Sequence, residues 1–176
     1  MSQPRIEVRD AQPYAGIRTQ ATLSEWGAVN ALVGEVMGWV AAHDLAVDGG
    51  SPLGFRVPAP LFRYYVVGDH ETPFDVEVGV PVRTPIDGDG RVQGGTIPGG
   101  SYAIITHHGH PDRFEESFAA LETWRAAENR QWDVRDEGTT RVWGSRLEQF
   151  LTDPTEQPDP ETWTSEIAFR LHEGTG

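Results

Sequence analysis

The segment PYAGIRTQATLSEW at residues 13–26 aligns without a gap with SYAIITHHGHPDRF at residues 101–114. The offset is 88 residues, half of the 176-residue chain, and the alignment brings together Tyr14 with Tyr102, Ala15 with Ala103 and Ile17 with Ile105. Three identities in fourteen positions are a weak signal alone. A fixed offset that recurs along a chain is, however, typical of an internal repeat.

A second pair of segments repeats at nearly the same offset. FDVEVGVPV at residues 74–82 lies over WTSEIAFRL at residues 163–171 and matches Glu77 to Glu166 at an offset of 89. Each half also shows the same order of elements, which strengthens the short alignments. The sequence therefore predicts one domain over residues 1–176, made of two half-repeats at about 1–86 and 87–176.

Hydrophobic periodicity predicts a strand, a helix and two further strands in each half. The predicted strands are residues 5–21, as one strand or a bent pair, 62–67, 75–82, 101–108, 142–151 and 163–171, and the predicted helices are 22 to about 44–48 and 111 to about 130. Residues 49–60 and 152–160 are predicted to be loops, 134–138 a turn, and 84–95 a polar linker. The predicted fold class is α+β, a duplicated β-α-β-β unit with pseudo-twofold symmetry, in which antiparallel sheets form a central seam flanked by two helices.

Two details of the first helix are also predicted. Thr22 and Glu25 have the spacing of a capping box, in which the two residues cap the helix start reciprocally. Gly34 and Gly38 each cost about 1 kcal/mol against alanine inside a helix, so a close approach of another backbone is expected to compensate.

Composition excludes several classes of function. The chain has 27 acidic and 14 basic residues, a formal net charge of −13 and no cysteine. This charge repels phosphate backbones, so direct DNA binding is not expected, and the absence of cysteine excludes disulfides and thiol catalysis. The sequence has no long apolar run or signal-like start, so we expect a cytoplasmic protein that does not enter the membrane.

Glu148 is the main candidate for a functional residue because it lies inside an apolar strand, near Trp143, Leu147 and Phe150. A buried carboxylate without a partner has a raised pKa, and a cationic or hydrogen-bond-donating ligand would relieve that cost. The alternative is a glutamate on the solvent face of an antiparallel strand. Both alternatives are open from the residue pattern, and the same holds for Glu77 and Glu166.

Aromatic residues supply candidate walls for a ligand site, because aromatic walls around one carboxylate hold flat or cationic organic molecules. The candidates are Trp39, Phe55, Tyr64, Tyr65, Tyr102, Trp143, Phe150 and Trp163. His107 is a further candidate, as a pocket base or hydrogen-bond donor. The run His107-His108-Gly109-His110 has poor geometry for a metal, since neighbouring strand residues point to opposite faces. No metal and no cofactor are expected.

Three segments together resemble the GyrI-like effector-binding domain, which occurs in AraC-type and MerR-type multidrug regulators and also alone. They are residues 74–82, residues 99–124 (GGSYAIITHHGHPDRFEESFAALETW) and residues 146–171 (RLEQFLTDPTEQPDPETWTSEIAFRL). The resemblance implies that Glu148 matches the buried glutamate with which family members bind cationic lipophilic compounds, and that Trp163 lies where the family often has a pocket wall. Phe150 stands where tyrosine is common, and Gly109-His110-Pro111 replaces the usual Gly-Pro-aromatic, which leaves the ligand's identity open.

Three functions follow from these observations. The first is a stand-alone bacterial protein that binds a cationic or flat aromatic drug or natural product between its halves. The second is a hydrolase of cyclopropane-bearing DNA-alkylating compounds that uses Glu148 and protects the cell. The third is a module that interacts with gyrase, as the naming member of the family does. A homodimer and an unknown protein partner are left open, and Arg63, aligned with Glu148 at an offset of 85, is a candidate partner for this carboxylate.

Overall fold

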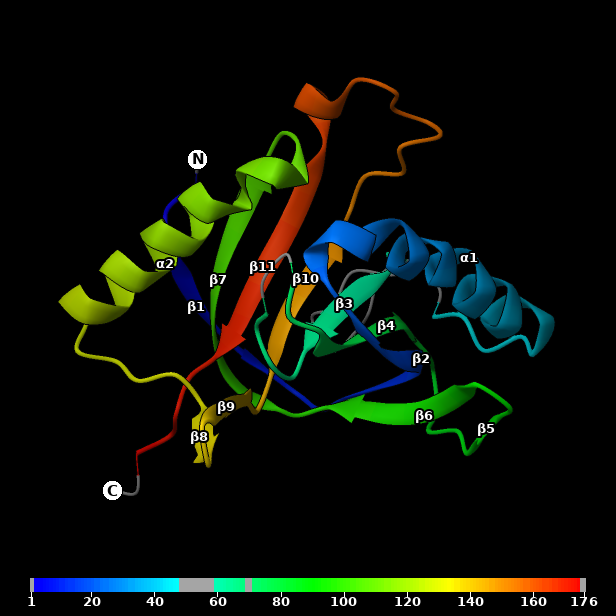
Figure 1. Cartoon of the computed structure of the whole chain (residues 1–176), viewed down its shortest axis with the longest axis horizontal. Coiled ribbons are helices and arrows are strands. Elements are labelled where there is room, and N and C mark those ends of the chain that lie inside the picture. Colours follow the sequence, from blue (N-terminus) through cyan, green and yellow to red (C-terminus); the bar gives the residue numbers. More distant parts are fainter. Residues whose placement is uncertain (1, 48–58, 69–70, 175–176) are drawn as a thin grey trace.

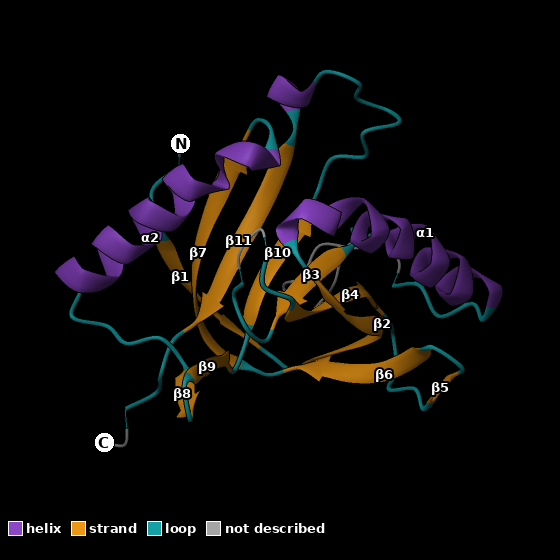
Figure 2. Cartoon of the chain, in the orientation of Figure 1, coloured by secondary structure: helices purple, strands orange, loops and turns teal. Residues whose placement is uncertain are grey.

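An antiparallel sheet carries both helices on one face (Figures 1 and 2). The computed structural model describes residues 2–47, 59–68 and 71–174. Within these residues the sheet has nine strands in the order β1-β7-β11-β10-β3-β4-β2-β6-β5, and β8 and β9 form a separate hairpin. The strands of the sheet are β1 (Arg5–Arg9), β2 (Gln12–Ala21), β3 (Leu61–Tyr64), β4 (Phe74–Pro81), β5 (Gly88–Asp89), β6 (Val92–Ile97), β7 (Gly100–His108), β10 (Arg146–Phe150) and β11 (Thr164–Arg170).

The other elements are α1 (Trp26–Ala42), α2 (Phe114–Ala127) and the hairpin strands β8 (Val134–Glu137) and β9 (Thr140–Trp143). Short 3₁₀ turns at Leu23–Glu25 and Pro111–Arg113 lead into the two helices, and a third, Pro160–Thr162, precedes β11. The predicted mixed α+β fold with two helices and a large antiparallel sheet is confirmed. No helix in the described ranges is long and apolar enough to span a membrane.

The middle of the sheet is the pair formed by β10 and β3. Outward from this pair, the strands follow the order β10, β11, β7 on one side and β3, β4, β2 on the other. Each side therefore arranges its strands in the same way relative to its helix. This order supports the duplication, which stays a prediction.

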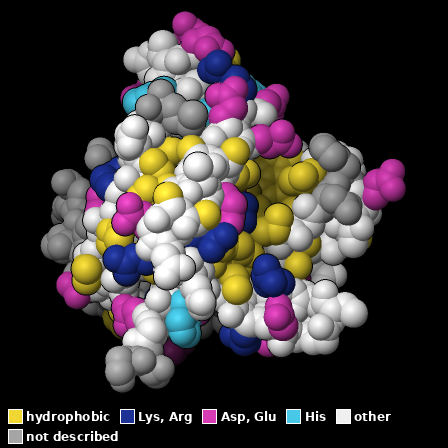
Figure 3. Space-filling model, turned by 90° about the vertical axis from the view of Figure 1, so that its left-hand side faces the viewer, with side chains coloured by type: hydrophobic (Ala, Val, Ile, Leu, Met, Phe, Trp, Pro, Cys, Tyr) yellow, Lys and Arg dark blue, Asp and Glu magenta, His cyan; other side chains and the backbone are white. Residues whose placement is uncertain are grey.

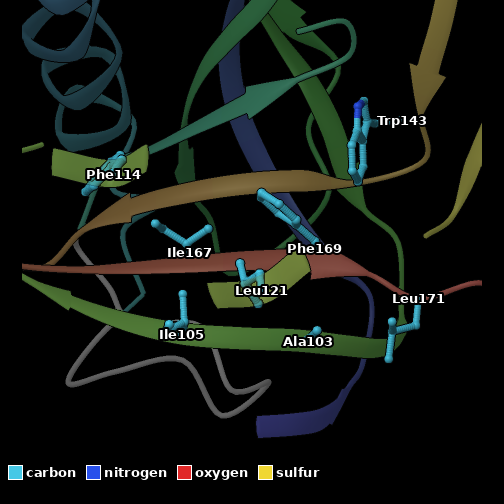
Figure 4. Packing of buried hydrophobic residues seen from close by; sticks show 8 residues of the cluster. All are labelled: Ala103, Ile105, Phe114, Leu121, Trp143, Ile167, Phe169 and Leu171. Carbon is cyan, nitrogen blue, oxygen red and sulfur yellow. The ribbon is translucent and has the colours of Figure 1, made fainter. Parts of the chain in front are cut away.

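Alternation along the strands divides the side chains between two faces of the sheet. On the helix face, Val29 of α1 packs with Phe62 and Val78, and Leu121 of α2 packs with Ile105 and Ile167. Figure 4 shows Ile105 on β7 beside Ile167 and Phe169 on β11. The opposite face buries a third cluster, which contains Tyr14, Leu61, Ile97, Tyr102, Ile104, Leu147 and Ala168.

Several element predictions were wrong. The predicted linker at residues 84–95 contains β5 and part of β6, because β6 pairs with β2. The predicted turn at 134–138 contains the whole of β8, and the single strand predicted at 142–151 is divided into β9 and β10. The predicted strand at 62–67 ends at Tyr64, whereas residues 5–21 form the bent pair β1 and β2, as expected. Most of the loop predicted at 49–60 lies outside the described residues.

The two helix details were also wrong. Thr22 makes no side-chain hydrogen bond to the helix backbone, and its hydroxyl instead bonds the side chains of Ser24 and Glu25. A Cβ added at Gly34 or Gly38 would meet no described atom within 4 Å. The two glycines therefore have no close backbone contact among the described residues.

Candidate functional site

Glu148 lies at the centre of the sheet on its helix face. Across β10 it is paired with Phe62 of β3 on one side and with Ile167 of β11 on the other. Both neighbours are apolar, and only 6% of Glu148 is exposed. The hypothesis of a buried glutamate thus agrees with the structure, and the alternative of a solvent-facing strand residue does not.

Burial and a tyrosine hydroxyl control the ionisation of Glu148. Desolvation raises the pKa of Glu148 to about 7, against the smaller lowering effects of a hydrogen bond from Tyr64 and the charge of Arg146. The Tyr64 hydroxyl donates to Oε2 of Glu148 at 2.7 Å, and burial beside this carboxylate raises the pKa of Tyr64 well above its ordinary value. Near neutral pH the carboxyl group therefore exists in both protonation states.

Aromatic rings surround this part of the helix face. Trp26 of α1 stacks on Tyr64 at a centroid distance of 6.0 Å and meets the edge of Phe62 at 5.6 Å. Phe150 lies 5.1 Å from Phe62 and 6.0 Å from Phe114 at the start of α2. One carboxylate is therefore held among rings contributed by both helices and by β3 and β10.

A cavity of about 570 Å³ lies beside α1 at the Phe150 end of β10. We call it the α1 cavity; its apolar lining includes Val33, Met37, Phe150 and Leu151, and its acidic lining consists of Asp153 and Glu156. Phe150 follows Glu148 by two residues and shares its face of the strand, so this ring lies next to both the cavity and the carboxylate. The acidic side chains favour a cation at this end.

A second cavity, of about 680 Å³, lies at the other end of β10, between α2 and the β8–β9 hairpin. We call it the hairpin cavity. Four aromatic residues line it, Phe118, Trp132, Trp143 and Phe169. Its charged lining differs from that of the α1 cavity, because it has three arginines, Arg125, Arg141 and Arg146, and one carboxylate, Glu122.

Of the predicted site residues, Glu148, Tyr64 and Phe150 come together, and Trp143 lies in the adjoining hairpin cavity. Tyr65 and Tyr102 lie elsewhere. The Tyr65 hydroxyl donates to Glu77 at 2.9 Å, and the Tyr102 hydroxyl donates to the carbonyl of Pro98. Tyr102 belongs to the cluster on the opposite face of the sheet.

Three further predicted residues make other contacts. Trp39 stacks on His43 at 3.9 Å, and Trp163 stacks on His110 at 5.6 Å. His107 is buried against Phe114 and shares a 2.8 Å hydrogen bond with the hydroxyl of Ser117, and desolvation lowers its pKa. Phe55 lies outside the described residues.

Arg63 is not a partner of Glu148. It pairs with Leu147 across β3 and β10, so its side chain is on the opposite face, where it donates to the Tyr14 hydroxyl and to the carbonyls of Thr96 and Gly144. The residue directly opposite Glu148 is Phe62. The assumed offset of 85 was one residue too small, and a shift of one residue moves a strand side chain to the other face.

Sequence reasoning missed Phe62, Trp26 and Arg146. A usable signal existed for Arg146, because it alternates with Glu148 and Phe150 along one strand and therefore shares their face. Phe62 could have been found from the correct pairing of the two central strands. Trp26 was assigned to the apolar stripe of the helix, with no contact to the carboxylate's surroundings.

Comparisons with known proteins agree with this fold. The sequence model of the GyrI-like small molecule binding domain matches residues 2–172. The crystal structure of the EcmrR C-terminal domain is similar with a TM-score of 0.70 and 17% identity, and the match covers 98% of each chain. In the EcmrR–DNA complex, solved by cryo-EM, the chain spans 58% of the EcmrR chain, with a TM-score of 0.70 and 16% identity.

Two other solved structures extend the comparison. A hydrolase from Listeria innocua has a TM-score of 0.59 and 13% identity, with 97% of this chain and 92% of the hydrolase covered. SAV2435 bound to tetraphenylphosphonium has a TM-score of 0.59 and 10% identity, with 97% and 94% covered. At these identities the similarities show the fold alone. No curated protein sequence matches this chain significantly.

Proposed function

This chain belongs to the GyrI-like small molecule binding domain family, and we propose that it binds a cationic, lipophilic aromatic compound next to Glu148. The observation that carries the proposal is a carboxylate with a pKa of about 7, buried among aromatic rings from both halves of the chain. A cation beside this group would favour its ionised form and offset the cost of desolvation.

The charges at the two ends of β10 support entry of a cation through the α1 cavity. Asp153 and Glu156 line that cavity, whereas the arginines of the hairpin cavity repel a cation. Because Glu148 is only 6% exposed, the ligand must displace a covering side chain to contact it. Phe150 is the residue that we expect to move, since it lines the α1 cavity and neighbours the carboxylate.

Calorimetric titration with tetraphenylphosphonium tests this function. We expect binding to the unmodified protein, and a loss of about tenfold or more in affinity for Glu148→Gln, because the variant removes the charge without changing the shape. Glu77→Gln is the matched control, since Glu77 is a buried carboxylate that accepts from Tyr65 on the opposite face. Equal affinity in the protein and Glu148→Gln would contradict the proposal.

A second candidate function is hydrolysis of a cyclopropane-bearing aromatic compound. It is favoured by the pKa of Glu148, since a general acid or base works best with a pKa near the working pH. Glu148 would accept a proton from water while the water oxygen bonds to a ring carbon and one carbon–carbon bond breaks. The protonated Glu148 would then return this proton to the carbon released by that bond, so that one water is added in total.

Mass spectrometry after a single turnover separates this reaction from binding. A cyclopropane-bearing indole is incubated with excess protein, and hydrolysis is expected to add the mass of one water to the compound. The gain should be lost in Glu148→Gln and kept in Glu77→Gln. Recovery of the intact compound alone would leave binding as the function.

A further inference from the structure

We propose that the hairpin cavity is a second binding site, which takes a planar aromatic carboxylate and holds its anionic group on the guanidinium of Arg146. The site is separate from the cation site at the α1 end of β10. The two sites lie on the same helix face of β10. The proposal of an anion site can nevertheless be correct or wrong independently of the proposed function. Four kinds of observation support it, namely the cavity, its aromatic walls, the state of Arg146 and the charges around it.

Arg146 is positioned by the sheet and by three rings. It is paired with Phe169 across β10 and β11, and its guanidinium carbon lies 4.2 Å from the ring centroid of Phe169 and 4.9 Å from those of Phe118 and Trp143. All three rings line the hairpin cavity. The cation is therefore held at the cavity wall by ring faces, and no carboxylate of residues 2–47, 59–68 and 71–174 forms an ion pair with its N–H groups.

One buried N–H group of Arg146 makes no hydrogen bond to the described residues. Its Nε is buried and has no hydrogen-bond partner in the part of the chain that the structure describes. Glu148, two residues away on the same face, acts on Arg146 through its charge alone, and burial lowers the pKa of Arg146. An unsatisfied buried donor on a charged group is costly, and a ligand acceptor that reached this donor would recover part of that cost.

The other charged groups of the cavity favour an anion. Glu122 accepts hydrogen bonds from Arg125 and, at 2.9 Å, from the indole of Trp132, so its charge is already compensated. Arg141 lines the cavity but is exposed, and its Nε lies 3.3 Å from a carboxylate oxygen of Asp136. Asp136 itself does not line the cavity. Arg146 therefore supplies a charge that no carboxylate of the cavity contacts, and a planar carboxylate matches the fork of a guanidinium in shape and charge.

The cavity also has a surface suited to a flat ring. Figure 3 views the side formed by α2 and the β8–β9 hairpin and shows hydrophobic side chains gathered in a hollowed area, with arginine and acidic side chains beside them. Trp132 and Trp143 lie 6.1 Å apart at their centroids and line the cavity. A volume of about 680 Å³ is sufficient for a two-ring aromatic acid.

The test compares naphthalene-2-carboxylate with naphthalen-2-ylmethylamine, which has the same ring system and the opposite charge. Binding is measured by calorimetry and by quenching of tryptophan fluorescence. The carboxylate is expected to bind with Arg146 intact and to lose about 10- to 100-fold in affinity in Arg146→Met, because a hydrogen bond to a charged group is removed. The amine is expected to show no such loss.

Three variants separate this role from general damage to the fold. Arg146→Lys keeps the charge without the fork and should lose less affinity than Arg146→Met. Arg135→Met is the matched control, since Arg135 is exposed on the same hairpin, pairs with Glu137 and does not line the cavity. Thermal melts of each variant show whether the fold is kept. If Arg146→Met unfolds, the loss of affinity in Arg146→Lys tests the proposal instead.

The two proposals have distinct failures. Carboxylate binding that is equal in the protein, Arg146→Met and Arg146→Lys overturns the anion site, even if tetraphenylphosphonium binds in a Glu148-dependent way. Carboxylate binding that depends on Arg146 and persists in Glu148→Gln supports it, even if no cation binds. Failure of the carboxylate to bind the unmodified protein at millimolar concentration also overturns it.

Discussion

Two residues of opposite charge, Arg146 and Glu148, share one face of β10 and are separated by a single position. The two side chains form no ion pair with each other. The carboxylate of Glu148 accepts a hydrogen bond from Tyr64, and the guanidinium of Arg146 lies among aromatic rings. Each charged group therefore keeps unused capacity to bind a ligand of the opposite charge. The two proposed sites, one for a cation and one for an anion, would therefore lie at the two ends of a short segment of a single strand.

The pKa of Glu148 predicts a specific dependence of stability on pH. Its pKa is about 7 in the folded protein and ordinarily 4.5, so the folded state binds the proton more tightly than the unfolded state. Stability contributed by this group is therefore present below pH 4.5 and falls as the pH rises to about 7, by about 3 kcal/mol in total. Glu148→Gln stays neutral and lacks this loss.

Urea unfolding of the protein and of Glu148→Gln at pH 5, 6, 7 and 8 measures this effect. The variant is expected to gain stability relative to the unmodified protein as the pH rises, with no further gain well above pH 7. Glu35→Gln, at an exposed glutamate of α1, serves as the control. A constant difference across this range would show that Glu148 titrates with an ordinary pKa.

Tyr64→Phe is expected to move the ionisation of Glu148 to higher pH. The hydroxyl of Tyr64 donates to the carboxylate and lowers its pKa, so its removal raises the pKa further above 7. Cation binding needs the ionised carboxylate, and its midpoint in a pH titration with tetraphenylphosphonium should rise. A midpoint that falls or does not change would contradict the role of this hydrogen bond.

Sequence reasoning identified the carboxylate but not the geometry around it. An acidic residue inside an apolar strand is visible in the sequence, which is why Glu148 could be selected. The identity of its neighbours depends on which strand pairs with β10 and in which register, and this is set by long-range pairing that local patterns do not encode. Tyr64 was therefore a candidate on equal terms with Tyr65, although only Tyr64 bonds Glu148.

At the scale of single elements, α1 contains two glycines that reduce its stability as a helix. Gly34 and Gly38 are exposed, and a Cβ at either position would have no described atom within 4 Å. Glycine loses more conformational freedom than alanine when a helix forms, and here no contact of the described residues compensates. The helix is kept in place by its buried residues Val29, Val36 and Val40.

We expect Gly34→Ala and Gly38→Ala each to stabilise the protein by up to about 1 kcal/mol. Chemical denaturation at equilibrium checks this. Gly79→Ala in β4 is the contrasting variant, because its Cβ would lie 2.9 Å from the Tyr14 ring and 3.2 Å from Leu61. That variant should be destabilised. Destabilisation by the helix variants instead would show that α1 has close neighbours at Gly34 and Gly38.

The β5–β6 segment shows why an element can escape detection. Its sequence is rich in glycine and polar residues, which is typical of a linker. Its conformation as a strand comes from pairing with β2, where Gly94 and Gly95 of β6 lie opposite Ala15 and Tyr14. A Cβ at Gly95 would lie 2.4 Å from the Tyr14 ring, so the glycine that weakened the strand prediction is required for the strand to form.

At the scale of the whole molecule, the two halves are joined by strand pairing and not by a hinge. β1 comes from the start of the chain and pairs with β7, β6 pairs back with β2, and β10 pairs with β3. The cluster on the opposite face also combines residues of both halves, including Leu61 and Leu147. The order strand, helix, strand, strand in each half was predictable, whereas β5, β6, β8 and the strand pairs that join the two halves were not.

Fragments 1–86 and 87–176 are accordingly expected not to fold when produced separately. Each would lose the strand pairs that cross the boundary and would expose its share of the common apolar cluster. Circular dichroism and proton NMR of each fragment, and of the equimolar mixture, measure this, and we expect ordered structure only in the mixture. A fragment that folds alone with native-like dispersion would show that the halves are independent domains.

The pairing of Phe62 with Glu148 has a consequence for how such a site can arise. If two identical half-chains associated about an axis between β10 and β3, each of these positions would hold the same residue, directly opposite its copy. Two glutamates there would repel each other or share one proton, and two phenylalanines would offer no charge. Joining the halves in one polypeptide removes this constraint, since a mutation can then change one position alone. A solitary carboxylate beside the axis is available to a fused chain and closed to a symmetric pair.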